Sequence, residues 1–203
     1  MQGITQFDQT KFWTSYKSTF GFAPQSQIEV DGTNGLLALI AADTLLERVE
    51  WGAFLLGTIR NECGAHMQPI KEKEARHDSR VWLEYQQHYW NTGYYGRGFS
   101  QLTLLGNYRQ FSQLLYNDDR LVKNPDLVLQ PEVGYQILSI GSVRGLFRHG
   151  YKLADFLNDA KTDFLDARQI VNGINSPLAF QAAQRYAGYA EKYNTCLKNA
   201  AVV

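Results

Sequence analysis

The chain has 203 residues, which is enough for one domain with a sizeable core or for two small lobes that share a cleft. Its 20 Lys and Arg residues balance 20 Asp and Glu residues. It therefore lacks the basic excess typical of nucleic-acid binding, and we expect no nucleic-acid partner. No apolar run approaches the roughly 20 residues that span a bilayer, and the first residues lack the basic and apolar regions of a secretory signal.

These properties predict a monomer that is made in the cytoplasm and has no transmembrane segment. We find no linker or internal repeat, so residues 1–203 are expected to form a single domain. The two cysteines, Cys63 and Cys196, are too few for a disulfide framework and lack the paired spacing of a zinc site. We expect free thiols, with one bridge between them as the alternative, and neither a metal nor a cofactor.

The N-terminal part, residues 1–45, is predicted to contain supporting helices. Apolar residues at helical spacing indicate a helix over 8–20 that stops at Gly21. A second helix is expected to begin at Pro24, and Asp31-Gly32 is a potential interruption of it. We predict no chemistry in this part of the chain.

The stretch from Arg48 to Cys63 is apolar on nearly every side, which predicts a central, buried helix. Glu62 lies in its last turn, at the edge of the apolar core and near the negative end of the helix dipole. Both influences disfavour the charged carboxylate and raise its pKa, as a general acid near neutral pH requires. The alternative is an ordinary solvated glutamate at a helix end.

A loop through Pro69 and a charged segment follow. Glu72 and Glu74 alternate with lysines, which is typical of a solvated face, although either carboxylate could face Glu62 across a groove. Residues 78–91 are rich in aromatic residues and are expected to form a helix or an irregular flap.

Residues 94–99 have strand-like content with two glycines, and we expect a small hairpin there and little other β-structure. Ser100 is predicted to cap the next helix, so that Gln101, Thr103 and Asn107 lie at its N-terminal end. Their hydroxyl and amide groups can orient a water molecule or bind a sugar, or they can simply cap the turn.

The rest of the chain is predicted to be helical. The expected helices begin at Pro125 and at Pro131, the latter continuing through Phe147, and further helices cover 153–157, 164–171 and 178–197. Asn172-Gly173 forms an exposed turn, and Pro177 marks the start of the final helix.

Three groups of residues then form a larger pattern. The most specific group is Tyr95-Gly96-Arg97-Gly98, followed by Gln101-Leu102-Thr103 and Asn107-Tyr108. Asn61-Glu62 ends an apolar helix, and residues 167–173 and 185–189 contain an Asn-Gly turn and an arginine-bearing helix. Together they resemble the glycoside hydrolase family 19 domain, the fold of class I chitinases and of many bacteriophage cell-wall lysins. The likeness covers roughly residues 45–195 and is closest to the short phage and bacterial members.

The resemblance implies a mainly α (α+β), lysozyme-like fold with two helical lobes around a cleft and at most a small β-hairpin. It also implies an inverting acid/base glycosidase, with Glu62 as general acid, Glu72 as general base and Thr103 as the hydroxyl that helps to hold the attacking water. Residues that match the family's substrate-facing positions are Tyr95, Arg97, Gln101, Asn107, Asn172 and Arg185. Glu74 stays open as the alternative base.

The implied substrate is the β-1,4-linked glycan of bacterial peptidoglycan, as for an endolysin or a muramidase, reached after release or delivery by another system. A chitinase acting on N-acetylglucosamine polymers is the nearest alternative. Asn61 stands where the family usually has His, and this departure motivates another alternative, a catalytically silent sugar-binding or virion structural module. A lytic transglycosylase that uses Glu62 alone is a further one.

Overall fold

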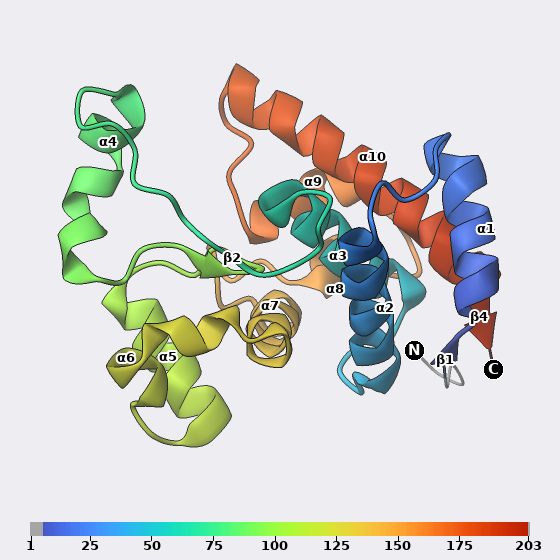
Figure 1. Cartoon of the computed structure of the whole chain (residues 1–203), viewed down its shortest axis with the longest axis horizontal. Helices are drawn as coiled ribbons and strands as arrows, with labels where there is room; N and C mark the ends of the chain where they lie inside the picture. Colours follow the sequence, from blue (N-terminus) through green and yellow to red (C-terminus); the bar gives the residue numbers. More distant parts are fainter. Residues whose placement is uncertain (1–5, 203) are drawn as a thin grey trace. The chain divides into compact units, whose positions relative to one another are not determined.

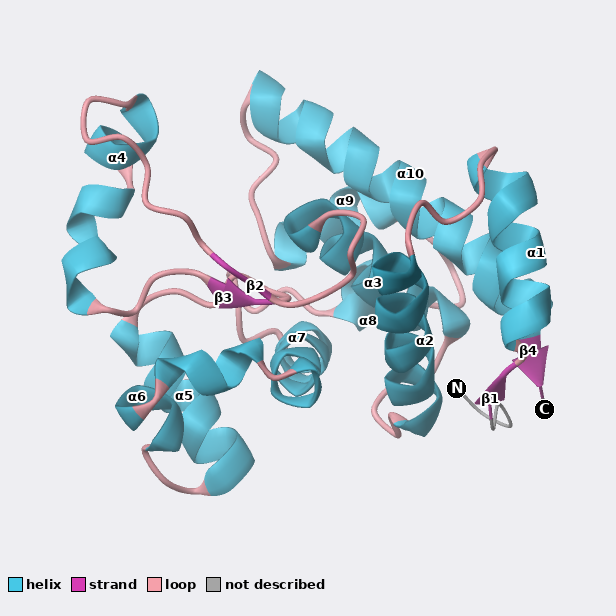
Figure 2. Ribbon diagram, in the orientation of Figure 1, coloured by secondary structure: helices cyan, strands magenta, loops and turns pink. Residues whose placement is uncertain are grey.

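The computed structural model of the chain describes residues 6–202 (Figure 1). The chain divides into two compact units: unit 1 consists of Met1–Met67 and Leu138–Val203, and unit 2 is Gln68–Ile137. In both units most of the ordered structure is helical (Figure 2). The strands of the described residues are two residues long and pair into two small sheets. The expected mainly helical fold class is confirmed.

Unit 1 is built around a long C-terminal helix. Its elements are β1 (Gln6–Phe7), α1 (Gln9–Phe20), α2 (Gln27–Ala42), α3 (Val49–Cys63), the second half of α7 (Pro131–Arg144), α8 (Leu153–Phe156), α9 (Phe164–Ala167), the 3₁₀ helix η4 (Arg168–Ile170), α10 (Pro177–Ala200) and β4 (Ala201–Val202). α10 packs along both α3 and α1 (Figure 1). β1 pairs with β4 in an antiparallel sheet that the sequence pattern did not predict.

The helix α3 is the centre of this unit, as its all-round apolar pattern predicted. Every residue from 51 to 60 is buried. Its contact with α10 is close at Gly57, where an added Cβ would lie 2.9 Å from the Cβ of Ala190 and 3.0 Å from its backbone. Only glycine lets the two helix backbones approach this far without strain.

The N-terminal helices differ in detail from the prediction. α1 begins after Asp8, whose side chain accepts the Lys11 backbone N–H, and it ends at Gly21 as expected. The start predicted at Pro24 is wrong: α2 begins after Ser26, which caps it by accepting the backbone N–H of Glu29. Capping by a hydroxyl satisfies a free N–H of the first turn, which proline at that position cannot do.

A buried charge cluster joins α1, α2 and α3. The Glu29 carboxylate accepts from Arg60 and from the Tyr16 hydroxyl, each at 2.7 Å, and from the Gln25 backbone N–H at 2.9 Å. Glu29 is 1% exposed and Arg60 9%. Burial opposes ionisation of Glu29, but these three donors together lower its pKa below the usual value. The cluster therefore stabilises this unit through charge-assisted hydrogen bonds.

Unit 2 has shorter elements. They are β2 (Ile70–Lys71), α4 (Arg80–Glu84), the 3₁₀ helices η1 (Gln86–His88) and η2 (Trp90–Thr92), β3 (Arg97–Gly98), α5 (Leu105–Tyr116), α6 (Arg120–Lys123), the 3₁₀ helix η3 (Pro125–Leu129) and the first half of α7. β2 and β3 are antiparallel, with Ile70 opposite Gly98 and Lys71 opposite Arg97.

Two predictions about helix ends were wrong. Ser100 does not cap a helix: α5 begins at Leu105, and residues 100–104 form a turn in which Gln101 and Leu104 have positive φ angles of 51° and 75°. The long helix α7 ends at Arg144 and does not continue to Phe147. Gln101 and Thr103 therefore lie in a tight turn before α5, and Asn107 lies in its first helical turn.

Cys63 and Cys196 are both buried, and no disulfide joins them. Within the described part of the chain, every helix is either too short or too polar to cross a bilayer.

Candidate active site

Glu62 forms an ion pair that the sequence did not indicate. The Arg168 Nη2 atom lies 2.6 Å from the Glu62 Oε1 atom, and the two side chains are 6% and 17% exposed, respectively. Arg168 is the first residue of η4, which follows α9 directly. The fold thus brings a buried cation to the last turn of α3.

The position of Arg168 is set by its surroundings. Its guanidinium carbon lies 5.5 Å from the ring centre of Tyr186 on α10, a cation–π geometry. Among the described residues, Glu62 is the acidic partner found for it. A buried guanidinium without a counter-ion is costly, so Arg168 and Glu62 hold each other in place.

Two polar residues extend this cluster. The Asn61 Nδ2 atom donates to Glu62 Oε1 at 3.3 Å, and the Nε atom of Arg185, from α10, lies 3.5 Å from Asn61 Oδ1. Arg185 is exposed, so it reaches the carboxylate through Asn61 and not directly. Asn172 is also exposed, and its backbone N–H donates to the Arg168 carbonyl oxygen at 2.9 Å. Unit 1 therefore gathers Glu62, Asn61 and Arg185, and the turn at Asn172 is tied to Arg168.

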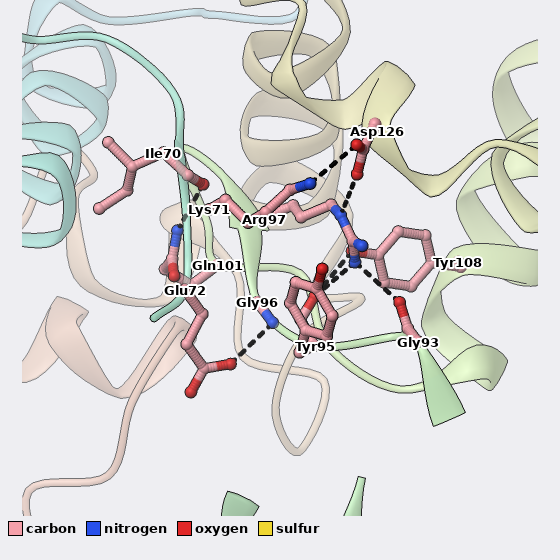
Figure 3. A network of polar contacts seen from close by, with 10 residues as sticks. All are labelled: Ile70, Lys71, Glu72, Gly93, Tyr95, Gly96, Arg97, Gln101, Tyr108 and Asp126. Carbon is pink, nitrogen blue, oxygen red and sulfur yellow. Dashed lines mark hydrogen bonds and ion pairs between the residues drawn. The ribbon is translucent and has the colours of Figure 1, made fainter. Parts of the chain in front are cut away.

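In unit 2, Glu72 is held by three donors. Its Oε1 atom accepts from Gln86 Nε2 at 2.8 Å and from the Tyr89 hydroxyl at 2.7 Å, and its Oε2 atom accepts from the Gly96 N–H at 2.8 Å. Figure 3 shows the carboxylate beside Gly96 at the end of β2. Three hydrogen bonds fix the orientation of this carboxylate.

Gly96 is required for that arrangement. A Cβ atom at residue 96 would lie 2.9 Å from Gln101 Oε1 and 3.1 Å from Glu72 Oε2. The backbone N–H of residue 96 can approach the carboxylate because no side chain intervenes. This explains in physical terms why a glycine stands between Tyr95 and Arg97.

Sequence reasoning missed the two side chains that hold Glu72. Gln86 is 2% exposed. Besides its bond to Glu72, it accepts the Ala75 N–H at 2.7 Å and donates to the Lys73 carbonyl at 2.9 Å. These hydrogen bonds hold the loop that carries Glu72 in place. Burial, followed by the hydrogen bond to Glu72, raises the pKa of Tyr89 well above its usual value, so this hydroxyl remains a donor at neutral pH. Both residues lie in the aromatic-rich segment 78–91, which was expected to form a helix or an irregular flap.

Glu74 has a different environment. It is exposed, and its Oε1 atom lies 2.9 Å from His77 Nε2, also exposed. Of these two glutamates, Glu72 is therefore the one that is built into the structure of unit 2.

Arg97 lies in a network of protein contacts. It is 4% exposed; its Nε atom donates to Asp126 at 2.6 Å, and its Nη1 atom donates to the carbonyl groups of Gly93 and Tyr95, each at 3.0 Å (Figure 3). Hydrogen bonds from Lys71 and then Arg97 lower the pKa of Asp126, and burial raises that of Tyr108 to about 12 although Arg97 opposes the shift. Arg97 therefore stabilises the glycine-containing turn through hydrogen bonds to its backbone carbonyl groups.

Tyr95 lies between two flat groups. Its ring is stacked on Trp90, with centroids 4.3 Å apart and planes at 19°, and the Arg97 guanidinium lies 4.0 Å from its centre. The ring is partly exposed. This stacking fixes Tyr95 in one orientation.

The polar residues after the turn form a short chain of hydrogen bonds. Gln101 Nε2 donates to the carbonyl groups of Ile70 and Gly98 at 3.1 and 3.0 Å, Thr103 Oγ1 donates to the Gln101 carbonyl at 2.8 Å, and Asn107 Nδ2 donates to the Thr103 carbonyl at 2.8 Å. Since the Thr103 hydroxyl donates its proton to the backbone, its lone pairs can accept from a water molecule.

Within residues 6–202, no group of three or more His, Cys, Asp or Glu side chains is arranged to hold a metal ion. The chemistry that the described side chains offer is that of carboxylates and their donors: Glu62 held by Arg168, and Glu72 held by Gln86, Tyr89 and Gly96. Oriented carboxylates of this kind serve general acid and base catalysis.

Solved structures with a similar fold bear on this arrangement. Chitinase C from Streptomyces griseus HUT6037 matches with a TM-score of 0.58 and 19% identity, over 89% of this chain and 75% of that chain. A mutant of chitinase C matches with a TM-score of 0.58 and 20% identity, over 92% of this chain and 76% of that one. No protein-family model matches the chain, and no curated protein does. The chain therefore has the mainly helical, lysozyme-like fold of these chitinase structures, as the resemblance in its motifs implied.

Proposed function

We propose that this protein is a glycoside hydrolase that cleaves β-1,4 bonds in the glycan strands of bacterial peptidoglycan. The observation that carries the proposal is the Glu62 carboxylate at the end of a buried helix, paired at 2.6 Å with the buried Arg168. The fold shared with chitinases supports a polysaccharide substrate. The short form and spare loops of the chain resemble those of phage and bacterial members of the family, and this resemblance favours peptidoglycan.

In the proposed mechanism, Glu62 is the general acid. It protonates the glycosidic oxygen as the bond to the anomeric carbon breaks, and Arg168 positions its carboxyl group. Such proton transfer contributes about 10²- to 10⁴-fold to the rate.

Glu72 is the proposed general base. With its orientation fixed by Gln86, Tyr89 and Gly96, it removes a proton from a water molecule that the Thr103 hydroxyl helps to hold, and this water attacks the anomeric carbon from the opposite face. The product has inverted configuration. Inversion requires carboxyl groups about 6.5–9.5 Å apart in the substrate complex, whereas a retaining pair needs about 5–5.5 Å.

Chitin is the second candidate substrate. It shares N-acetylglucosamine units with peptidoglycan, and the structures of similar fold are chitinases. In either case we propose that the protein acts as a monomer and reaches an extracellular polymer through release or delivery by another system.

The test is digestion of purified peptidoglycan and of colloidal chitin by the wild type, Glu62→Gln and the matched control Glu84→Gln, an exposed glutamate in α4. Mass spectrometry of the products should show muropeptides with new reducing ends from the wild type and the control, and loss of activity by at least about 100-fold in Glu62→Gln. The amide oxygen can still accept from Arg168, so the variant is expected to fold with a lowered Tm.

Each other result has a definite meaning. Chito-oligomers in place of muropeptides would move the assignment to a chitinase. Full activity of Glu62→Gln would remove this residue from the mechanism, and anhydro-muramic ends would indicate a lytic transglycosylase. Binding without cleavage by the wild type would favour a silent sugar-binding module.

A further inference from the structure

A groove on unit 1 lies outside both carboxylate clusters. It is formed by the helices α1 and α2 and has a volume of about 960 Å³. This size is within the range of about 300–1,000 Å³ that is usual for ligand sites. Its lining residues do not include any hydrogen-bond partner described above for Glu62 or Glu72, so the proposed reaction does not account for it.

Trp13 forms the aromatic part of the groove. Its indole Nε1–H donates to Asn34 Oδ1 at 3.0 Å, and the Phe12 ring packs against it edge-on at 5.3 Å. Trp13 remains partly exposed. The indole is therefore held in one orientation before any ligand binds, which reduces the entropy cost of binding.

Hydroxyl groups continue the same wall. Thr10, Thr14 and Ser18 line the groove at four-residue spacing and are all exposed. Thr14 donates its hydroxyl proton to the Thr10 carbonyl at 2.8 Å, and Ser18 donates to the Ser15 carbonyl at 2.9 Å. Their oxygen lone pairs stay available to accept from the hydroxyl or N-acetyl N–H groups of a ligand.

Lys17 is the charged residue among those that line the groove. Elsewhere on the two helices, Lys11 lies on α1, and the buried Glu29 and the exposed Asp31 lie on α2. The Lys17 ammonium group can pair with a carboxylate group of a ligand.

We propose that this groove is a second, non-catalytic binding site for an acidic, N-acetylated glycan. One sugar ring lies with its apolar C–H face on Trp13, its polar groups meet the hydroxyls of Thr10, Thr14 and Ser18, and a carboxylate lies near Lys17. The strand of peptidoglycan, with its lactyl carboxylates, has this chemistry, whereas neutral chitin lacks the charge. The identity of the ligand rests on the proposed function; the existence of the site does not.

Such a site would hold the enzyme on a polymer between cleavage events. Two linked binding sites raise the effective affinity for a repeating ligand without any new contact at the catalytic carboxylates.

The test is an NMR titration of the Glu62→Gln variant with a soluble tetrasaccharide of alternating N-acetylglucosamine and N-acetylmuramic acid. The Trp13 indole N–H and the backbone amides of residues 10–18 should shift saturably. Trp13→Ala should weaken binding, measured at the backbone amides of residues 10–18, about tenfold, and Lys17→Gln about two- to fivefold. Lys123→Gln is the matched control, since Lys123 is an exposed lysine of α6 that does not line this groove; it should leave binding unchanged.

Several outcomes separate this proposal from the proposed function. No saturable shift at Trp13, while amides near Glu62 respond, would overturn the groove and leave the enzyme assignment intact. Saturable shifts at Trp13 together with no cleavage by the wild type would support the groove and overturn the enzyme. Equal binding of a chitin tetrasaccharide would overturn the assignment to an acidic ligand. Shifts seen only with phosphatidylglycerol vesicles would overturn the glycan proposal.

Discussion

The side chain of Arg168 connects the candidate acid to a distant part of the chain. It is nearly buried, contacts Glu62 at 2.6 Å and lies over the ring of Tyr186. We regard it as a positioning residue, because it acts on the glycosidic bond through the carboxyl group of Glu62.

Substitution of Arg168 tests this role. Arg168→Gln should lower kcat about 100-fold with a small change in KM. Arg168→Lys, which keeps the charge, should restore much of the rate. A fall in Tm with an unchanged kcat at temperatures where the variant is folded would contradict the positioning role and leave a structural one.

Glu72 and Glu74 form a matched pair for testing the base. Glu72 accepts three hydrogen bonds, whereas Glu74 is exposed beside His77. Glu72→Gln should lower activity at least about 100-fold, and Glu74→Gln should leave it within about threefold. Hydrolysis rates of peptidoglycan measure both. Equal losses in the two variants, or a loss confined to Glu74→Gln, would show that the base was assigned to the wrong residue.

At the scale of the element, α3 determines where Glu62 lies. The helix is buried along residues 51–60 and is pressed against α10 at Gly57. The position of the last turn of α3, which carries Glu62, depends on this packing. A shift of the α3–α10 contact would therefore move the candidate acid as well.

Two glycine substitutions test that contact. Gly57→Ala should lower the free energy of unfolding by about 1–3 kcal/mol, because the new methyl group overlaps Ala190. Gly35→Ala, in α2, meets nothing within 4 Å and should raise it by about 0.4–1 kcal/mol by restricting the unfolded chain. Denaturant titration measures both values. A neutral Gly57→Ala would mean that the helices separate easily at this contact.

The turn before α5 shows how a local signal can mislead. Ser100 before an apolar stripe is a usual N-cap pattern, yet the helix starts five residues later. Tertiary contacts decide this start: Gln101 bonds to the carbonyl groups of Ile70 and Gly98, so residues 100–104 follow β2 and β3 and cannot become helical.

At the scale of the whole molecule, acid stability depends on the buried cluster around Glu29. Its pKa is lowered in the folded state, so its stabilising contribution is present above the unfolded value of about 4.3 and is lost as pH falls through the folded value. The Tm of the wild type should therefore decline below about pH 5.

Glu29→Gln should lower the free energy of unfolding at neutral pH by about 3–5 kcal/mol, because it leaves Arg60 buried without its counter-ion. Its Tm should also depend less on pH than that of the wild type in the acid range. Asp31→Asn, an exposed change in the same helix, is the control and should keep the wild-type profile. Parallel acid profiles of Glu29→Gln and wild type would contradict this account.

The sequence by itself determined the helices whose apolar pattern is long and regular: α1, α3 and α10 lie close to where periodicity and capping residues predicted them. It also indicated Glu62 as a carboxylate to examine, because a carboxylate at the end of an apolar helix is a local signal, whereas Glu72 was singled out from Glu74 only by the resemblance to a known family. Such features depend on neighbours a few residues apart, and a single sequence displays those neighbours directly.

Only the tertiary structure decided which side chains surround these carboxylates. Arg168 lies 106 residues from Glu62 in the chain, and Gln86 lies 14 residues from Glu72 in a segment without regular periodicity. The pairing of β1 with β4 and the groove between α1 and α2 likewise join segments that have no shared local pattern. Contacts of this kind depend on how buried faces pack, which hydrophobic periodicity in one segment does not specify.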